Sequence, residues 1–214
     1  MHKHVLIILA ALLLTVAGCS NQDSEQPVLV VLETELGNIT LALDAQRAPQ
    51  ATNYLLSFIE NGQYDGATLY RSASLDQQQP PQLVQGGVLQ GALNSSTVVN
   101  PADYGVTHLL REWESTEKTG LRHNRGTISL ARDLLATGQV IPELVFCLRD
   151  IPSMDAGGDG RLDNKGFPVF GQVVGGMDII DTVSQSELNG PTTIGFLEGQ
   201  ILTQPLNIIS AYRL

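Results

Sequence analysis

Short apolar runs rich in Val, Ile and Leu recur along most of the chain, and Gly, Pro or Asn separates each run from the next. Each run is long enough for one β-strand, and the eight runs are residues 28–33, 38–43, 67–71, 83–89, 126–131, 143–148, 169–174 and 206–212. The first two, joined through Gly37, predict a hairpin. Helical spacing occurs over residues 49–61 and 176–183. Eight strands with so little helix between them predict a mainly β protein, either an antiparallel barrel or a sandwich.

The N-terminus has the pattern of an export signal. Lys3 precedes an apolar run at 5–14, which is far shorter than the roughly 20 residues that span a bilayer as a helix. Residues 16–19, Val-Ala-Gly-Cys, resemble the lipobox of bacterial lipoproteins, which implies removal of residues 1–18 and lipidation of Cys19. An ordinary cleavage site beside a chance cysteine is the alternative. Ser20 in that pattern implies sorting to the outer membrane, so we expect a lipid-anchored protein of the cell envelope that faces the periplasm.

We expect a polar tether at 19–27 and one folded domain at 28–214. The net charge of −10 and the absence of basic runs argue against a nucleic-acid partner. After cleavage only Cys147 remains unlipidated, in an apolar run that predicts a buried thiol. His108 and His123 stand apart from any Cys cluster, so no metal is expected. Residues 155–160 lack the ligand pattern of an EF-hand and predict a flexible loop, and a nucleophile-elbow motif is missing, which disfavours a hydrolase.

Several polar segments have a specific order along the chain. The two most specific are GLRHNRGTISLAR at 120–132 and VFGQVVGGMD at 169–178; the others are residues 33–41, 48–55, 64–66, 70–71 and 84–87. This order resembles the cyclophilin-type peptidyl-prolyl isomerases over nearly all of residues 28–212. The resemblance implies a closed eight-stranded antiparallel β-barrel capped by two α-helices, in agreement with the independent strand pattern.

The resemblance also implies a site. Rotation about an X–Pro amide faces a barrier of about 18–20 kcal/mol, and a donor that follows the twisting amide lowers it without covalent chemistry or a cofactor. Arginine suits this task because its charged donors are held in one plane, and Arg71 matches the catalytic arginine of the family. The substrate-binding positions implied by the resemblance are Tyr70, Gln82, Leu83, Gln85, Ala131, Arg132, Glu143, Val145, Leu162 and Phe167.

Several of these positions depart from the family pattern. Tyr70 replaces the usual His, Gln82 and Val145 replace aromatic residues of the proline pocket, and Glu143 replaces a Gln. Arg161 stands where many members carry an aromatic residue. A pocket with less apolar surface holds proline less firmly. Opposite charges also suggest that Glu143 pairs with Arg71, which would either hold the guanidinium in place or divert it from substrate.

We therefore expect a monomeric isomerase that acts on proline-containing polypeptides exported to the cell envelope and assists their folding. A non-catalytic module that binds proline peptides is the alternative. A passive structural barrel is disfavoured, because it would not need Tyr70, Arg71 and Gln85 together.

Overall fold

The computed structural model describes residues 26–75, 80–94, 101–133, 137–160 and 163–214. The predicted signal peptide, Cys19 and most of the tether lie outside these residues, as do Arg161 and Leu162. Among the described residues, none of the helices combines the length and the apolar character needed to cross a bilayer.

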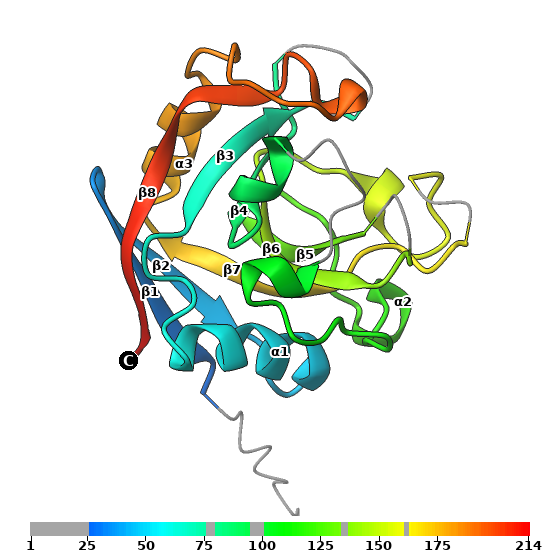
Figure 1. The fold of residues 1–214 in the computed structure, drawn as a ribbon. Helices are drawn as coiled ribbons and strands as arrows, with labels where there is room; N and C mark the ends of the chain where they lie inside the picture. Colours follow the sequence, from blue (N-terminus) through cyan, green and yellow to red (C-terminus); the bar gives the residue numbers. More distant parts are fainter. Residues whose placement is uncertain (1–25, 76–79, 95–100, 134–136, 161–162) are drawn as a thin grey trace, which may run out of the picture.

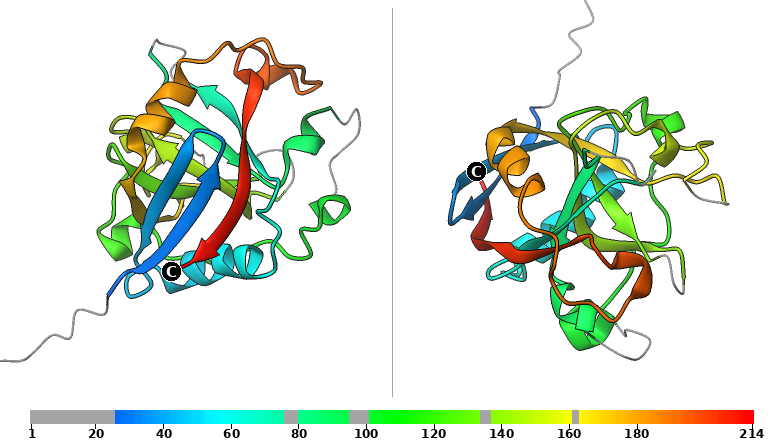
Figure 2. Two further views of the ribbon diagram at one scale, coloured as in Figure 1. Left: turned by 90° about the vertical axis from the view of Figure 1, so that its left-hand side faces the viewer. Right: turned by 90° about the horizontal axis from the view of Figure 1, so that it is seen from above.

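Within the described residues, eight antiparallel strands form one closed barrel (Figure 1). The strands are β1 (Val28–Thr34), β2 (Gly37–Leu43), β3 (Thr68–Ala73), β4 (Leu83–Gly87), β5 (Thr127–Arg132), β6 (Val140–Cys147), β7 (Val169–Gly175) and β8 (Ile201–Arg213). Their order around the barrel is β1-β2-β7-β5-β6-β4-β3-β8, and β8 closes the sheet by pairing with β1. The predicted hairpin of β1 and β2 lies beside β8 (Figure 2, left). Closure leaves no free strand edge, and the predicted barrel is confirmed.

The last strand begins earlier than its apolar run predicts. β8 starts at Ile201, and Pro205 lies inside it. Against β3, Leu69 pairs with Leu206 whereas Arg71 pairs with Ile201, so the register shifts between these two pairs. This shift in the pairing accommodates Pro205, which has no N–H to donate to the neighbouring strand. The proline therefore marks a bulge inside β8.

Two helices close opposite ends of the barrel (Figures 1 and 2). In α1 (Pro49–Glu60), proline occupies the first turn, where its missing N–H costs nothing, and the predicted apolar face is buried. The second predicted helix is α3 (Met177–Ser184). A further single turn, α2 (Thr116–Thr119), was not predicted, because four residues carry no helical period. Its signals were the Ser115 N-cap and Gly120, whose φ is 72°.

Strands β4 and β6 bury both of their faces. Val84 and Phe146 belong to the main core inside the barrel, whereas Leu83, Val145 and Cys147 belong to a second apolar cluster. Because side chains alternate along a strand, this second cluster lies on the outer face of the barrel. Cys147 is buried as predicted, and burial raises the pKa of its thiol to about 12.

Candidate active site

A cavity of about 200 Å³ lies over this outer face. Strands β3 to β6 form its floor, and the loops around them form its walls. The lining residues are Tyr70, Arg71, Leu75, Leu83, Gln85, Leu89, Ala92, Leu93, Ala131, Arg132, Asp133, Ile141, Val145, Met154, Phe167, Ile194, Phe196 and Leu197. The lining is mostly apolar, with a few polar groups from neighbouring strands. Such a surface suits a small apolar ring attached to a polar backbone.

Arg71 is held by two side-chain amides. It lies on β3 opposite Gln85 of β4, and its Nη1 donates to Gln85 Oε1 at 2.7 Å. Its Nε and Nη2 donate to Gln200 Oε1 at 3.0 and 2.6 Å. Gln200 is itself fixed, because its Nε2 donates to the Phe196 carbonyl at 2.7 Å. Burial lowers the pKa of Arg71, but a guanidinium remains charged in proteins.

Glu143 does not pair with Arg71 within the described residues, which corrects the sequence interpretation. Its Oε2 accepts from the Tyr70 hydroxyl at 2.6 Å, and its Oε1 accepts from the Leu89 N–H at 2.8 Å. Glu143 is on the same side of β6 as Val145, as the alternation predicts, but the segment after β4 folds over it. The carboxyl group is therefore fully buried beneath the cavity wall and does not line the cavity.

The glycines of β4 explain how the strands come so close together. A Cβ at Gly86 would overlap the Thr68 carbonyl of β3, and a Cβ at Gly87 would lie 2.6 Å from Glu143 Oε1. The Gln-Gly-Gly motif therefore brings Gln85 to the cavity while leaving room for the backbone of β3 and for a buried carboxyl group.

Most of the remaining predicted residues line the cavity. Leu83, Ala131, Val145 and Phe167 supply apolar surface to it. Gln82 does not line it within the described part of the chain, so the cavity lining gives no support to its predicted substrate contact. The Gln82 Oε1 instead accepts from the Leu75 N–H at 2.7 Å. Leu162 cannot be placed, because it lies outside the described residues.

Arg132 lines the cavity but its charge is directed toward protein groups. Its Nε donates to the Gly138 carbonyl at 2.7 Å, and its Nη1 donates to the Gly166 carbonyl at 3.0 Å. It also forms an ion pair with Asp163. Its guanidinium carbon lies 4.7 Å from the ring centre of Trp113, a cation–π contact. Arg132 thus ties the cavity wall together.

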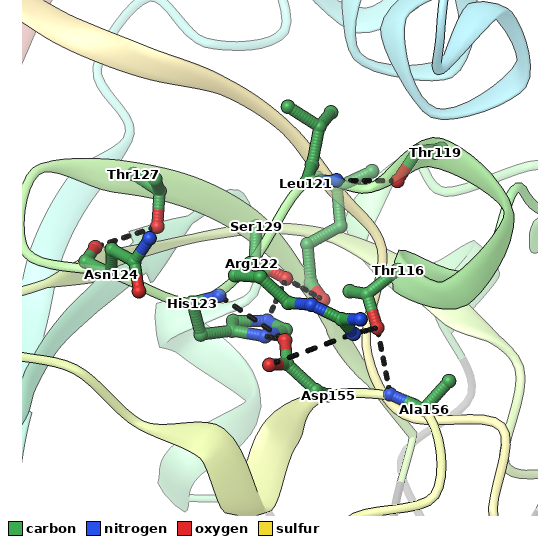
Figure 3. A network of polar contacts seen from close by, with 11 residues as sticks. Thr116, Thr119, Leu121, Arg122, His123, Asn124, Thr127, Ser129, Asp155 and Ala156 are labelled. Carbon is green, nitrogen blue, oxygen red and sulfur yellow. Dashed lines mark hydrogen bonds and ion pairs between the residues drawn. The ribbon is translucent and has the colours of Figure 1, made fainter.

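His123 lies at the centre of a buried polar network (Figure 3). Its Nδ1 lies 2.7 Å from Asp155 Oδ1, and its Nε2 lies 3.1 Å from Ser129 Oγ. This order resembles a Ser-His-Asp triad, but Ser129 is completely buried and His123 is 1% exposed, so substrate cannot reach the hydroxyl. The His123 ring packs edge-on against Phe167 with 6.4 Å between ring centres. The network therefore supports the cavity wall.

The same network changes the interpretation of residues 155–160. Asp155, which was expected in a flexible loop, bonds the side chain and the backbone N–H of His123. Across the described chain, no group of three or more His, Cys, Asp or Glu is arranged to hold a metal ion.

Part of the site carries no motif that the sequence could reveal. Gln200, which binds Arg71, and the apolar residues Leu89, Leu93, Phe196 and Leu197 come from segments between the recognised motifs. A lone glutamine in a Gly-rich loop gives no periodic signal. The one available signal was the apolar pair Phe196-Leu197 within an otherwise polar segment.

The structure is a closed antiparallel barrel that carries an apolar cavity on its outer face, with an arginine fixed at the edge of the cavity, as the resemblance to the cyclophilins implied. The chain belongs to the family described as cyclophilin type peptidyl-prolyl cis-trans isomerase/CLD, which it matches over residues 29–211. The predicted family and enzyme class are confirmed.

Bacterial relatives support this assignment. The chain is 27% identical over 210 residues to a peptidyl-prolyl cis-trans isomerase of Acinetobacter baylyi, covering 98% of this chain and 95% of that protein. It is 31% identical over 156 residues to peptidyl-prolyl cis-trans isomerase A of Dickeya dadantii, covering 73% and 70%. The fold also matches a cyclophilin-type isomerase of Cryptosporidium parvum, with a TM-score of 0.62 and 14% identity, covering 88% of this chain and 98% of that one.

Proposed function

We propose that Arg71 is the catalytic group of this isomerase and that the neighbouring cavity holds the proline ring of the substrate. The observation that carries this proposal is the position of Arg71, at the edge of an apolar cavity and fixed by the amide oxygens of Gln85 and Gln200.

The bonding of Arg71 supports a role in transition-state stabilisation. A guanidinium has five N–H donors, and three of the Arg71 donors bond to protein within the described residues. The other two form no such bond there and are available to a substrate amide. As the X–Pro bond twists, its nitrogen lone pair loses delocalisation and becomes a better acceptor. A donor that bonds the twisted amide more strongly than the planar one lowers the barrier.

The test is an NMR exchange assay on a tetrapeptide with a central Ala-Pro bond; a solved relative of the same fold was obtained in the presence of the dipeptide Ala-Pro. Arg71→Ala should lower kcat/KM by one to three orders of magnitude, which is about 1.4–4 kcal/mol. Arg71→Lys should restore little of this loss, because an ammonium cannot reproduce the planar fork of donors.

Circular dichroism and urea unfolding of both variants serve as the folding control. Wild-type exchange at the uncatalysed rate, together with binding of the peptide, would favour the non-catalytic peptide-binding alternative. Unchanged catalysis in Arg71→Ala would remove Arg71 from the mechanism.

We also propose that the enzyme acts on exported polypeptides from a lipid anchor at Cys19. The support is in the sequence: Lys3, the apolar run at 5–14 and the lipobox-like residues 16–19. The substrates would then be proline-containing chains that fold after export, and the anchor would keep the barrel at the membrane surface.

A further inference from the structure

A continuous line of hydrogen bonds joins the buried carboxyl group of Glu143 to the guanidinium of Arg71. Tyr70 Oη donates to Glu143 Oε2 at 2.6 Å, and Gln85 Nε2 donates to Tyr70 Oη at 3.4 Å. The other end of the same amide, Gln85 Oε1, accepts from Arg71 Nη1 at 2.7 Å. Four side chains from three strands, β3, β4 and β6, therefore form one relay.

We propose that Glu143 is a positioning residue for isomerisation, whose charge state sets the direction of this relay and thereby the orientation of Gln85 and Arg71. The inference rests on the proposed catalytic role of Arg71. It extends that role by adding a buried group that touches no substrate and acts through Tyr70 and Gln85.

The direction of the relay follows from what each group can donate. A carboxylate only accepts, so Tyr70 must direct its O–H toward ionised Glu143. The Tyr70 oxygen then accepts from Gln85 Nε2, which leaves Gln85 Oε1 facing Arg71. Burial beside Glu143 raises the pKa of Tyr70 far above its usual value, so the hydroxyl keeps its proton throughout.

Protonation of Glu143 reverses this logic. A carboxylic acid can donate from Oε2 to the Tyr70 oxygen while Oε1 still accepts from the Leu89 N–H. The Tyr70 proton is then displaced toward Gln85, which must turn its amide to accept it. The Gln85 NH₂ group would then face the Arg71 guanidinium, donor against donor. Arg71 would lose one of its two holding groups.

The surroundings of Glu143 place this change near neutral pH. Burial raises the pKa of Glu143 to about 7, although bonds from Tyr70 and from the Leu89 and Val88 amides oppose the rise. The other titratable groups that face Glu143 are Tyr54 of α1 and Tyr64 of the loop after α1; both have raised pKa values. Within the described residues, the relay links Glu143 to the charge of Arg71, and Gln85 separates that guanidinium from Tyr70 and Glu143.

The experiment measures kcat/KM of the full-length chain by NMR exchange, which needs no coupled protease, from about pH 5.5 to about pH 8.5. Wild-type kcat/KM should rise roughly tenfold with increasing pH, with one midpoint near 7, as expected for loss of one hydrogen bond to a charged group at low pH. Glu143→Gln should give a flat profile at the low-pH level, because its amide NH₂ donates to Tyr70 as the protonated acid does.

Three further variants separate positioning from stability. Tyr70→Phe removes the link but keeps the carboxyl group, and it should also flatten the profile. Glu114→Gln is the matched control, because Glu114 is a buried carboxyl group that accepts from the Gln50 N–H at 3.2 Å, outside the cavity lining. It should retain the wild-type profile. His108→Gln removes an exposed imidazole outside the cavity lining and should also retain the profile.

A readout that does not depend on catalysis distinguishes this inference from the proposed function. The side-chain amide signals of Gln85 should shift with a midpoint near pH 7 in wild type and should not shift in Glu143→Gln. If wild type fails to catalyse at any pH, the proposed function fails and the Gln85 titration alone decides on the relay. Gln85 signals that stay constant with pH, or parallel profiles in wild type and Glu143→Gln, would overturn the inference.

Discussion

At the scale of single residues, the neutral acceptors around Arg71 are the main feature of the site. Gln85 and Gln200 fix the plane of the guanidinium through their amide oxygens. A carboxylate at either position would hold it equally well but would neutralise the charge that the twisted amide has to meet. The nearby carboxylate, Glu143, accepts a hydrogen bond from Tyr70 and does not contact Arg71 within the described residues. Among the described residues, no carboxylate pairs with Arg71, so the site combines a rigid donor with a positive charge that this part of the chain leaves uncompensated.

The size of Val145 yields a prediction about proline binding. Val145 is 2% exposed and lines the cavity in contact with the outer apolar cluster. Val145→Phe should extend apolar surface into the open cavity and lower KM for the Ala-Pro tetrapeptide several-fold, with kcat nearly unchanged. Overpacking should cost about 1–3 kcal/mol of unfolding free energy, which urea unfolding would measure.

Gln82→Phe is the matched comparison, because both positions carry aromatic residues in the family pattern. Gln82 does not line the cavity, and its Oε1 holds the Leu75 N–H. This variant should leave KM unchanged or raise it. A gain in Gln82→Phe with none in Val145→Phe would show that the cavity described here is not the proline pocket.

These residues also show what the sequence could and could not predict about the site. Leu83, Gln85 and Val145 were assigned through the family resemblance, and they lie together on the cavity because alternate residues of a strand share a face. Glu143 lies on the same face of β6 as Val145, but the pattern of a strand cannot predict that a loop covers its carboxyl group. Gln200 reaches Arg71 across 129 positions in the sequence, and no local pattern records such a contact.

At the scale of elements, the His123 network joins β5 to the segment that carries the cavity wall. Ser129 belongs to β5, and the His123 carbonyl accepts from the Ile151 N–H at 2.7 Å. Asp155 Oδ1 accepts from the His123 side chain and backbone. Met154 and Phe167, which line the cavity, are bonded to each other through the Phe167 N–H and the Met154 carbonyl at 2.9 Å. Loss of the His123 network should therefore make one wall of the cavity less rigid.

The network predicts a pH-dependent contribution to stability. Burial lowers the pKa of His123 despite its bond to Asp155. The folded state thus favours the neutral imidazole, so this contribution is present above the unfolded pKa of about 6.5 and is lost as pH falls through the lower folded pKa. His123→Gln should cost about 1–3 kcal/mol near neutral pH and less at about pH 5, measured by urea unfolding.

The test must compare the unfolding free energy of His123→Gln with that of wild type at each pH. Wild type alone is not enough, because Glu143 changes stability with pH in the opposite direction. Burial raises its pKa from 4.5 to about 7, so its contribution to stability is lost as pH rises through about 7. Asp155 does not interfere in this window. Burial raises its pKa, but bonds from His123 and the charge of Arg122 outweigh this and keep the pKa below 3.8. Exposed His108, changed to Gln, is the control. A His123→Gln deficit that grows on acidification would contradict the prediction.

Elements with a clear period could be predicted from the sequence, and those defined by tertiary contacts could not. The apolar face of α1 is repeated several times within one segment, and β6 is a nearly continuous apolar run, so packing follows the local pattern. By contrast, the start of β8 at Ile201 depends on pairing with β3 around a bulge. α2 is one turn held by its caps. The cavity walls come mainly from such irregular segments.

At the scale of the whole molecule, closure of the barrel and net charge define how the protein meets its surroundings. The β1–β8 pairing removes the free edges on which other chains could add a strand. Removal of residues 1–18 would take away one basic group from a chain with 12 basic and 22 acidic groups, which leaves a net charge of −11. Anionic lipid repels such a surface. Retention at a membrane would then depend on a specific anchor.

The anchor proposal predicts the behaviour of the two cysteines in cells. Wild type should incorporate a labelled fatty acid and sediment with membranes, and Cys19→Ser should lose the label. Cys147→Ser is the matched control, because that thiol is fully buried, and it should keep the label.

A third chain, in which an ordinary cleavable secretory signal replaces residues 1–19, should appear in the soluble periplasmic fraction with kcat/KM unchanged, since β1 begins only at Val28. It is needed because an uncleaved apolar run at 5–14 would itself hold Cys19→Ser at the membrane. Wild type without label in the soluble fraction would favour an ordinary signal peptide, and label that persists in Cys19→Ser would eliminate Cys19 as the attachment site.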